Sequence, residues 1–280
     1  MLRDFTIAGK AKSTFNNYIR CLAHIALHYK ISPEKLDTEQ VKDYLYFCKE
    51  QHQTPSDSFF KHTVYGLRSA YKSLGINDKT IALPQIPKNR KLPIVLNRRE
   101  IRELLFAPKY QRHKMMLGLL YGCGLRSYEL CKLKVADVDL ERQTLYIAAQ
   151  KGKHDRFIPL SHHLVRGLQT YITSEKPQEY LFNSQVSTDG KPHPITTRAV
   201  FWLIKEIRSK VNTSKKFTAH SLRHSYATHL LEDGLDILSL QKRLGHARIE
   251  TTLMYLHISQ LEKVNIISPL DKVLGTDEKS

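Results

Sequence analysis

Six positions in the second half of the chain carry residue types that could together act on a phosphate diester. In chain order they are Arg126, Lys151, His220, Arg223, His246 and Tyr255. Arginine, lysine and histidine side chains bind phosphate oxygens, and a tyrosine hydroxyl is a nucleophile that can attack phosphorus. The sequence shows no carboxylate cluster at metal-ligand spacing and no glycine-rich nucleotide loop beside them. The set therefore predicts metal-free phosphoryl transfer through a protein nucleophile.

Each of these residues, taken alone, has an ordinary explanation. Tyr255 is one of 14 tyrosines, and the chain also contains 14 histidines. A zinc site built from His220, His224 and His229 is an alternative, but no cysteine or carboxylate stands at a suitable spacing. The prediction therefore depends on the joint order of the six positions and not on any one of them.

The charge of the chain favours a polyanionic partner. Its 44 Lys and Arg against 27 Asp and Glu give a net charge of +17, which points to nucleic acid or an anionic membrane surface. No apolar run approaches the ~20 residues of a membrane span, and residues 1–12 lack a signal-peptide hydrophobic stretch. Nucleic acid is therefore the better partner. We expect buried free thiols, typical of a reducing cytoplasm, at Cys21, Cys48, Cys123 and Cys131.

The first part of the chain is expected to form a small helical bundle. Ser13 is a plausible N-cap for a helix whose apolar stripe comprises Phe15, Tyr18, Ile19, Leu22, Ala26 and Tyr29. Residues 84–96 contain prolines and the basic run at 88–91, a composition typical of an extended linker. The linker is either a solvated spacer or a direct contact to phosphate.

A second domain is expected to begin at Asn97, which forms a capping-box variant with Glu100. The expected elements are helices over 115–121 and 127–133, strands over 144–149 and 156–160, and helices after Ala219. A turn at 151–153 joins the strands, and a last short helix is expected to hold Tyr255. These patterns predict a mainly α protein with a small antiparallel β-sheet, an α+β fold.

Two motifs extend this prediction to a known family. They are Gly-Leu-Arg-Ser-Tyr-Glu-Leu at 124–130 and His-Ser-Leu-Arg-His-Ser-Tyr-Ala-Thr at 220–228, followed by Leu-Gly-His at 244–246 and a tyrosine nine residues later. With them the chain closely resembles the tyrosine recombinase (phage integrase) family, particularly its small Xer-like two-domain members. The resemblance implies a helical core-binding (SAM-like) domain over 1–83, a linker over 84–96, a catalytic domain over 97–262 and a tail over 263–280. It also implies a C-shaped clamp on DNA.

The resemblance implies the roles of the six residues as well. Arg126 and Arg223 match the arginines that bind the phosphate, and His246 adds a hydrogen bond. Tyr255 matches the nucleophile; its reference pKa near ~10 calls for a base or a cationic pocket, and His220 is the nearest candidate. Lys151, with Lys153 as the neighbouring alternative, matches the hairpin lysine that protonates the leaving 5′ oxygen. Glu129 and His224 are expected as supports.

The resemblance implies site-specific recombination of duplex DNA through a 3′-phosphotyrosyl intermediate and a Holliday junction, with no metal, ATP or other cofactor. A tetramer on two DNA sites, from a monomer or dimer off DNA, is expected in a cytoplasmic, nucleoid-associated protein of bacterial or mobile-element type. Two alternatives stay open: a type IB topoisomerase-like strand transferase, and a DNA-binding accessory protein that does not use the site. The candidate DNA contacts are Arg68, Lys88, Arg90, Lys91 and Lys153.

Overall fold

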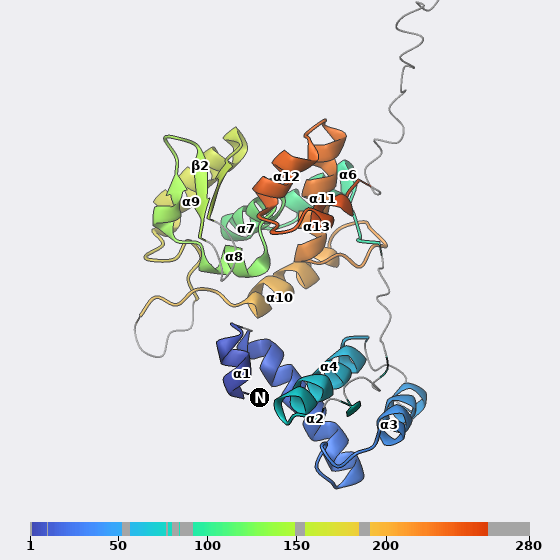
Figure 1. Ribbon diagram of the computed structural model, residues 1–280. Helices are drawn as coiled ribbons and strands as arrows, with labels where there is room; N and C mark the ends of the chain where they lie inside the picture. Colours follow the sequence, from blue (N-terminus) through green and yellow to red (C-terminus); the bar gives the residue numbers. More distant parts are fainter. Residues whose placement is uncertain are drawn as a thin grey trace, which may run out of the picture. The chain divides into compact units, whose positions relative to one another are not determined.

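The computed structural model describes residues 2–9, 11–51, 57–76, 78–79, 84, 92–148, 155–184 and 191–256. The chain divides into two compact units, Met1–Arg90 and Lys91–Ser280 (Figure 1). None of the described helices is both long and apolar enough to cross a membrane.

The first unit is a helical bundle. Its helices are α1 (Leu2–Ile7), α2 (Lys12–Tyr29), α3 (Thr38–Gln51) and α4 (Asp57–Ser73). Helices α2 and α4 pack against each other, and Ile25, Val64 and Leu67 belong to their fully buried core. The start of α2 differs from the prediction: its N-cap is Ala11, which makes no side-chain hydrogen bond, so Ser13 lies inside the first turn.

The second unit is mainly helical and contains a small sheet. Its elements are α6 (Arg98–Phe106), α7 (Gln111–Gly122), α8 (Ser127–Lys132), a short 3₁₀ helix (Val135–Asp137), β1 (Val138–Asp139), β2 (Thr144–Ile147), β3 (Arg156–Pro159), α9 (His162–Glu175), α10 (Thr197–Arg208), α11 (Ala219–Glu232), α12 (Ile237–Leu244) and α13 (Glu250–Leu253). The strands form an antiparallel sheet in the order β1-β2-β3. The predicted fold class, mainly α with a small antiparallel sheet, is confirmed.

Local sequence signals explain several of these elements. Helix α6 begins with the expected capping box, in which the Asn97 side chain accepts from the Glu100 N–H at 2.8 Å and the Glu100 carboxylate accepts from the Asn97 N–H at 2.8 Å. The prediction did not include α9 and α10, although Ser161 and Thr196 cap them with side-chain hydrogen bonds. These caps are signals that the sequence carries.

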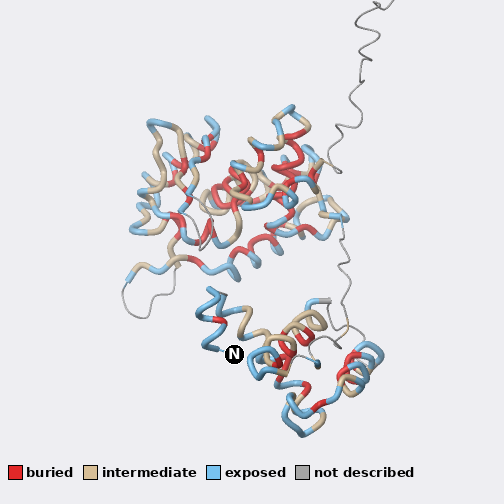
Figure 2. The backbone as a smooth tube through the Cα atoms, viewed as in Figure 1, coloured by how far each residue is buried: buried red, intermediate tan, exposed pale blue. Residues whose placement is uncertain are grey.

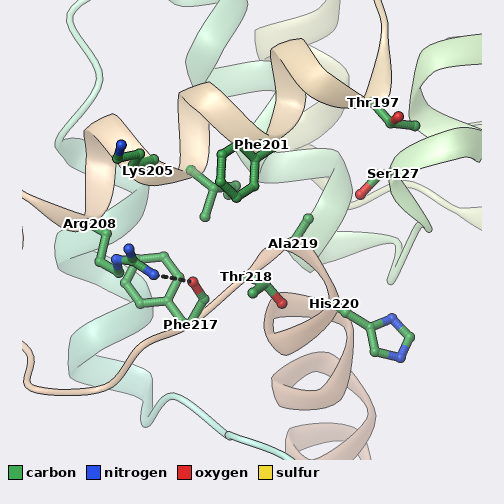
Figure 3. A pocket seen from close by; sticks show the side chains of 10 residues that line it. Ser127, Thr197, Phe201, Lys205, Arg208, Phe217, Thr218, Ala219 and His220 are labelled. Atoms are coloured by element: carbon green, nitrogen blue, oxygen red, sulfur yellow. Dashed lines mark hydrogen bonds between the residues drawn. The ribbon is translucent and has the colours of Figure 1, made fainter. Parts of the chain in front are cut away.

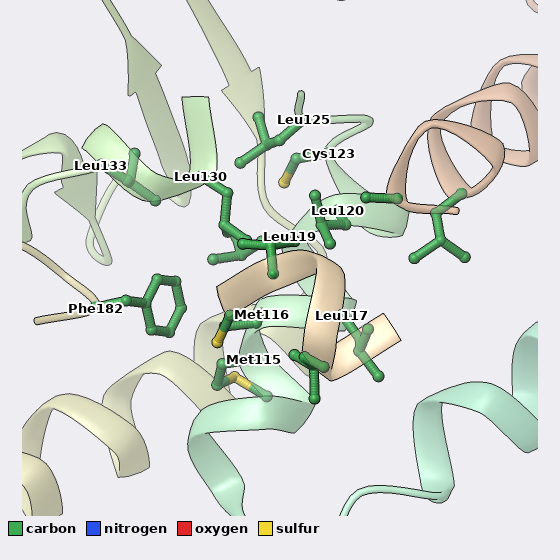
Figure 4. Packing of buried hydrophobic residues seen from close by; sticks show 14 of the residues in the cluster. Met115, Met116, Leu117, Leu119, Leu120, Cys123, Leu125, Leu130, Leu133 and Phe182 are labelled. Carbon is green, nitrogen blue, oxygen red and sulfur yellow. The ribbon is translucent and has the colours of Figure 1, made fainter. Parts of the chain in front are cut away.

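The core of the second unit is built around α7 and α11, where buried residues concentrate (Figure 2). Helix α7 buries two methionines and three leucines, shown in Figure 4: Met115, Met116, Leu117, Leu119 and Leu120. Burial of each such side chain contributes about 1.5–3 kcal/mol before entropy costs. Helix α11 is buried over most of its length, so its polar residues are held by a rigid core. The four cysteines are free and buried, as expected.

Candidate active site

The structure places five of the six expected residues on elements of the second unit. Arg126 is the N-cap residue of α8, and His220 and Arg223 lie one turn apart on α11. His246 follows the end of α12 at Gly245. Tyr255 lies in the turn after α13, which ends at Leu253, so the expected helix stops before the tyrosine instead of containing it.

Arg223 is the residue on which these elements converge. Its side chain is fully buried; Nη1 donates to the Gly124 carbonyl at 2.5 Å, and Nη2 donates to the Leu244 carbonyl at 2.5 Å. Nη2 also lies 3.1 Å from His246 Nε2. Burial, followed by the charge of Arg126, lowers the pKa of Arg223 to about 10, so it stays cationic at neutral pH.

The Nε donor of Arg223 is not used by the hydrogen bonds described above. Its Nε is buried and has no hydrogen-bond partner among the described residues. A buried N–H normally has a partner, and a fixed guanidinium with a free donor suits a phosphate oxygen. Arg223 therefore carries one donor that the described residues do not satisfy, within the cluster that also contains Arg126.

Arg126 lies beside Arg223 and shares one of its acceptors. Arg126 Nη1 donates to the Leu244 carbonyl at 3.4 Å and to Glu129 Oε1 at 2.8 Å. Burial would raise the pKa of Glu129, but Arg156 and then Arg126 lower it to about 2. Glu129 is therefore ionised and holds the arginines in place. The structure places this expected support at the centre of the site.

Arg156 is a member of this cluster that the sequence did not identify. It donates from Nη1 and Nη2 to the two oxygens of Glu129, at 3.1 and 2.9 Å. Its position in a strand gives no indication of this pairing, because the contact joins β3 to α8 across 27 positions of the chain. Only the tertiary structure reveals it.

His246 has a tautomer that its neighbours fix. A guanidinium can only donate, so His246 Nε2 accepts from Arg223 at 3.1 Å. The proton of the neutral ring then lies on Nδ1, which donates to the Thr252 hydroxyl at 2.9 Å. The ring also stacks on that of Tyr255, with centroids 6.4 Å apart. His246 is thus oriented from three sides between the arginine and the tyrosine.

Tyr255 is buried with its hydroxyl beside a histidine. The hydroxyl lies 3.0 Å from Nδ1 of His224, not from His220, the base that the sequence suggested. His220 contacts His224 edge to face, with centroids 4.3 Å apart. Burial raises the pKa of Tyr255, and the charges of Arg223 and then Arg126 partly offset this rise. The tyrosine is therefore protonated at neutral pH and must give up its proton to react, and the two arginines reduce the cost of that step.

Two hollows are each lined in part by residues of the site and in part by basic side chains. Figure 3 shows the first, a cavity of 200 Å³ whose lining includes Lys205, Arg208 and His220. The second, of 530 Å³, is lined in part by Lys242, Arg243 and His246. The cationic side chains at both hollows suit contact with a polyanion.

Several expected residues cannot be placed. Lys151, Lys153, Lys88, Arg90 and Lys91 lie outside the described residues, as does the tail over 263–280. Arg68 is placed on α4, where it donates to the Pro84 carbonyl at 3.3 Å. Within the part of the chain that the structure describes, no group of three or more His, Cys, Asp or Glu residues could hold a metal ion.

Comparison with known proteins gives the family. The model of the Phage integrase family matches residues 95–262. The chain belongs to this family. A tyrosine recombinase of Pseudothermotoga lettingae is 37% identical over 82% of this chain and 81% of its own, and the tyrosine recombinase XerA of Thermococcus kodakarensis is 37% identical over 70% and 69%.

The fold comparison agrees with this membership. The integrase of transposon Tn1549, solved in complex with transposon right end DNA, shares the fold with a TM-score of 0.69. It is 21% identical, and the match covers 91% of this chain and 92% of that one. Membership in the phage integrase family confirms the prediction of a tyrosine-type site-specific recombinase.

Proposed function

We propose that this recombinase cuts and rejoins duplex DNA with Tyr255 as the covalent nucleophile. The observation that carries the proposal is the convergence of Arg126, Arg223 and His246 beside the buried tyrosine. Attack of the tyrosine oxygen on phosphorus forms a 3′-phosphotyrosyl bond and breaks the bond to the 5′ oxygen, which leaves as a hydroxyl. A second DNA 5′-hydroxyl then attacks this adduct and releases the tyrosine.

The described residues support distinct roles in this step. Negative charge gathers on the non-bridging oxygens as phosphorus becomes five-coordinate, and Arg126 and Arg223 offer fixed donors to those oxygens. His224 accepts the hydrogen bond of the Tyr255 hydroxyl and so orients the nucleophile. His220, exposed at the start of α11, is proposed as the base that assists it. The ester bond is conserved in the adduct, so rejoining needs no ATP.

Further parts of the proposal come from the family resemblance. Lys151 is proposed as the acid that protonates the leaving 5′ oxygen. Arg68 and the basic residues of the linker are proposed as DNA contacts, with the two units enclosing the duplex as a clamp. Two strand exchanges through a Holliday junction require four active sites, so a tetramer on two DNA sites is proposed. A cytoplasmic location near the nucleoid accords with this role.

The test uses covalent capture from a pool of duplexes with a randomised central segment. The full-length chain is incubated with the pool, denatured, and run on a denaturing gel. We expect a DNA-shifted protein band with a selected sequence from the wild type, and no such band from Tyr255→Phe although it still retards the selected duplex on a native gel. An undiminished adduct from Tyr255→Phe would overturn the assignment of the nucleophile.

A further inference from the structure

The carboxylate of Glu129 is saturated with hydrogen bonds, and Arg156 supplies half of them. Oε1 accepts from Arg126 Nη1 at 2.8 Å and from Arg156 Nη1 at 3.1 Å. Oε2 accepts from the Arg126 backbone N–H at 2.9 Å and from Arg156 Nη2 at 2.9 Å. An ionised carboxylate has about four acceptor sites, so none is left for another donor.

Arg223 lies just outside this saturated group. Its Nη1 is 3.9 Å from Glu129 Oε2, beyond a hydrogen bond, and donates instead to the Gly124 carbonyl. Glu129 is 6% exposed and Arg223 is 1% exposed, so their attraction is weakly screened by water. Arg156 and Arg126 together occupy the acceptor sites of Glu129, and the Gly124 carbonyl holds Arg223 Nη1.

Arg156 is itself held firmly from β3. Its side chain is 9% exposed, and Nε donates to the Arg243 carbonyl at 3.0 Å. Gly245, at a φ of +61°, has no side chain in the way: a Cβ there would lie 3.1 Å from Arg156 Nη1. Because Gly245 has no side chain, the Arg156 guanidinium packs closely against the backbone just before His246.

We propose that Arg156 is a positioning residue for the recombinase reaction: it occupies Glu129 and so keeps that carboxylate from drawing Arg223 away from the phosphate. The inference rests on the proposed function, since it concerns the same phosphate site. Without Arg156, two acceptor positions on Glu129 lose their donors. Arg223 Nη1, 3.9 Å from Oε2, is close enough to move and fill one of them. That movement would take Arg223 off Gly124 and displace its Nε, which has no hydrogen-bond partner among the described residues.

If Arg156 acts in this way, the slower DNA cleavage expected without it is caused by the negative charge of Glu129. Removing the charge of Glu129 together with that of Arg156 should therefore restore part of the cleavage rate that is lost when Arg156 alone is neutralised. Arg156→Gln is expected to lower the rate constant of DNA cleavage about 100-fold, as displacements near 1 Å can. The double variant Arg156→Gln/Glu129→Gln is expected to be at least about tenfold faster than Arg156→Gln, because a neutral amide no longer attracts the guanidinium.

The experiment measures single-turnover cleavage of a nicked duplex that carries the sequence captured by the wild-type chain. Enzyme is in excess and at a concentration that saturates the duplex, so the rate constant does not depend on how much of a variant is folded. Arg142→Gln is the matched control: its side chain is 85% exposed beside the same sheet, and its rate should equal that of the wild type. Glu129→Gln alone is expected to be slow, because it leaves Arg156 buried without a charge partner.

The outcomes separate this inference from the proposed function. If the wild type forms no adduct at Tyr255, the proposed function fails before Arg156 is tested. If the wild type cleaves and Arg156→Gln cleaves equally fast, Arg156 positions nothing. If the double variant is as slow as Arg156→Gln or slower, the charge of Glu129 is not the cause, and that result overturns the proposal. Recovery in the double variant, with the control unchanged, supports it.

Discussion

The Nδ1 atom of His224 lies 3.0 Å from the hydroxyl oxygen of Tyr255 inside a buried contact. Burial, then the charges of His220 and Arg223, lowers the pKa of His224 to about 4. The ring is therefore neutral at physiological pH, and Nδ1 can accept the phenolic hydrogen. The nucleophile of the proposed reaction is thus oriented by the residue next to Arg223 on α11.

The burial of His224 makes the stability of the second unit sensitive to acid. The pKa of His224 returns to ~6.5 in the unfolded chain, so on acidification the unfolded state takes up the proton first. The stabilisation by neutral His224 is complete above about pH 6.5 and is lost as the pH falls toward 4. Between pH 7 and pH 5 the wild type should lose ~2 kcal/mol more unfolding free energy than His224→Gln.

Urea denaturation at the two pH values measures this difference. Glutamine keeps a polar side chain at the position but does not titrate, and the other histidines are common to both proteins. Parallel losses in the wild type and His224→Gln would show that His224 is not the titrating group.

Arg223→Lys tests the geometry of the phosphate site. A lysine has one nitrogen and cannot reach the Gly124 and Leu244 carbonyls and His246 together. We expect the rate of adduct formation to fall about 10²–10³-fold, as for loss of a transition-state donor, while duplex affinity changes less than about tenfold because many phosphate contacts remain. The control is Arg99→Lys, whose side chain is 87% exposed. Adduct formation at the wild-type rate by Arg223→Lys would contradict the assigned role.

Gly124 is required by the backbone that presents its carbonyl to Arg223. It has a φ of +58°, and a Cβ there would lie 2.4 Å from the Tyr226 ring. Gly124→Ala should therefore destabilise the chain by about 3 kcal/mol or more, from left-handed strain and overpacking. Gly234→Ala is the matched control, with a φ of +89° and open space around it; it should cost only about 1 kcal/mol. Equal thermal shifts in the two variants would refute the steric argument.

DNA affinity should depend steeply on salt. Residues 86–280 hold 32 Lys and Arg against 19 Asp and Glu, and release of counterions from the phosphates favours binding at low salt. For six or more phosphate contacts, affinity is expected to fall about 10³-fold or more between 50 and 200 mM salt. Fluorescence anisotropy of a labelled duplex measures this, with sucrose as an uncharged control. A flat salt dependence would exclude an electrostatic interface.

The order of the six residues and the local caps were enough to predict the family, the fold class and the start of α6. Periodicity did not reveal α9 and α10, yet Ser161 and Thr196 each stand at a helix start with a capping side chain. Those two helices follow from a signal that is local. In contrast, the turn that holds Tyr255 after α13 depends on how the last segment packs.

The buried contacts of the site are of another kind. Arg156 meets Glu129, and His224 meets Tyr255, across separations of 27 and 31 positions. Each pairing depends on which faces of α8, β3 and α11 turn inward, and spacing along the chain does not encode that. The sequence therefore identified which residues could act, whereas the structure showed which side chains hold them in place.

The most direct test of the central claim is to locate the bond between protein and DNA. The adduct formed with the randomised duplex pool is digested with nuclease and protease, and the peptides are analysed by mass spectrometry. We expect a phosphodeoxynucleotide on the hydroxyl of Tyr255, with its phosphate linked as the 3′ end of the cut strand. A nucleotide on any other residue, or a 5′-phosphate linkage, would contradict this account of the recombinase.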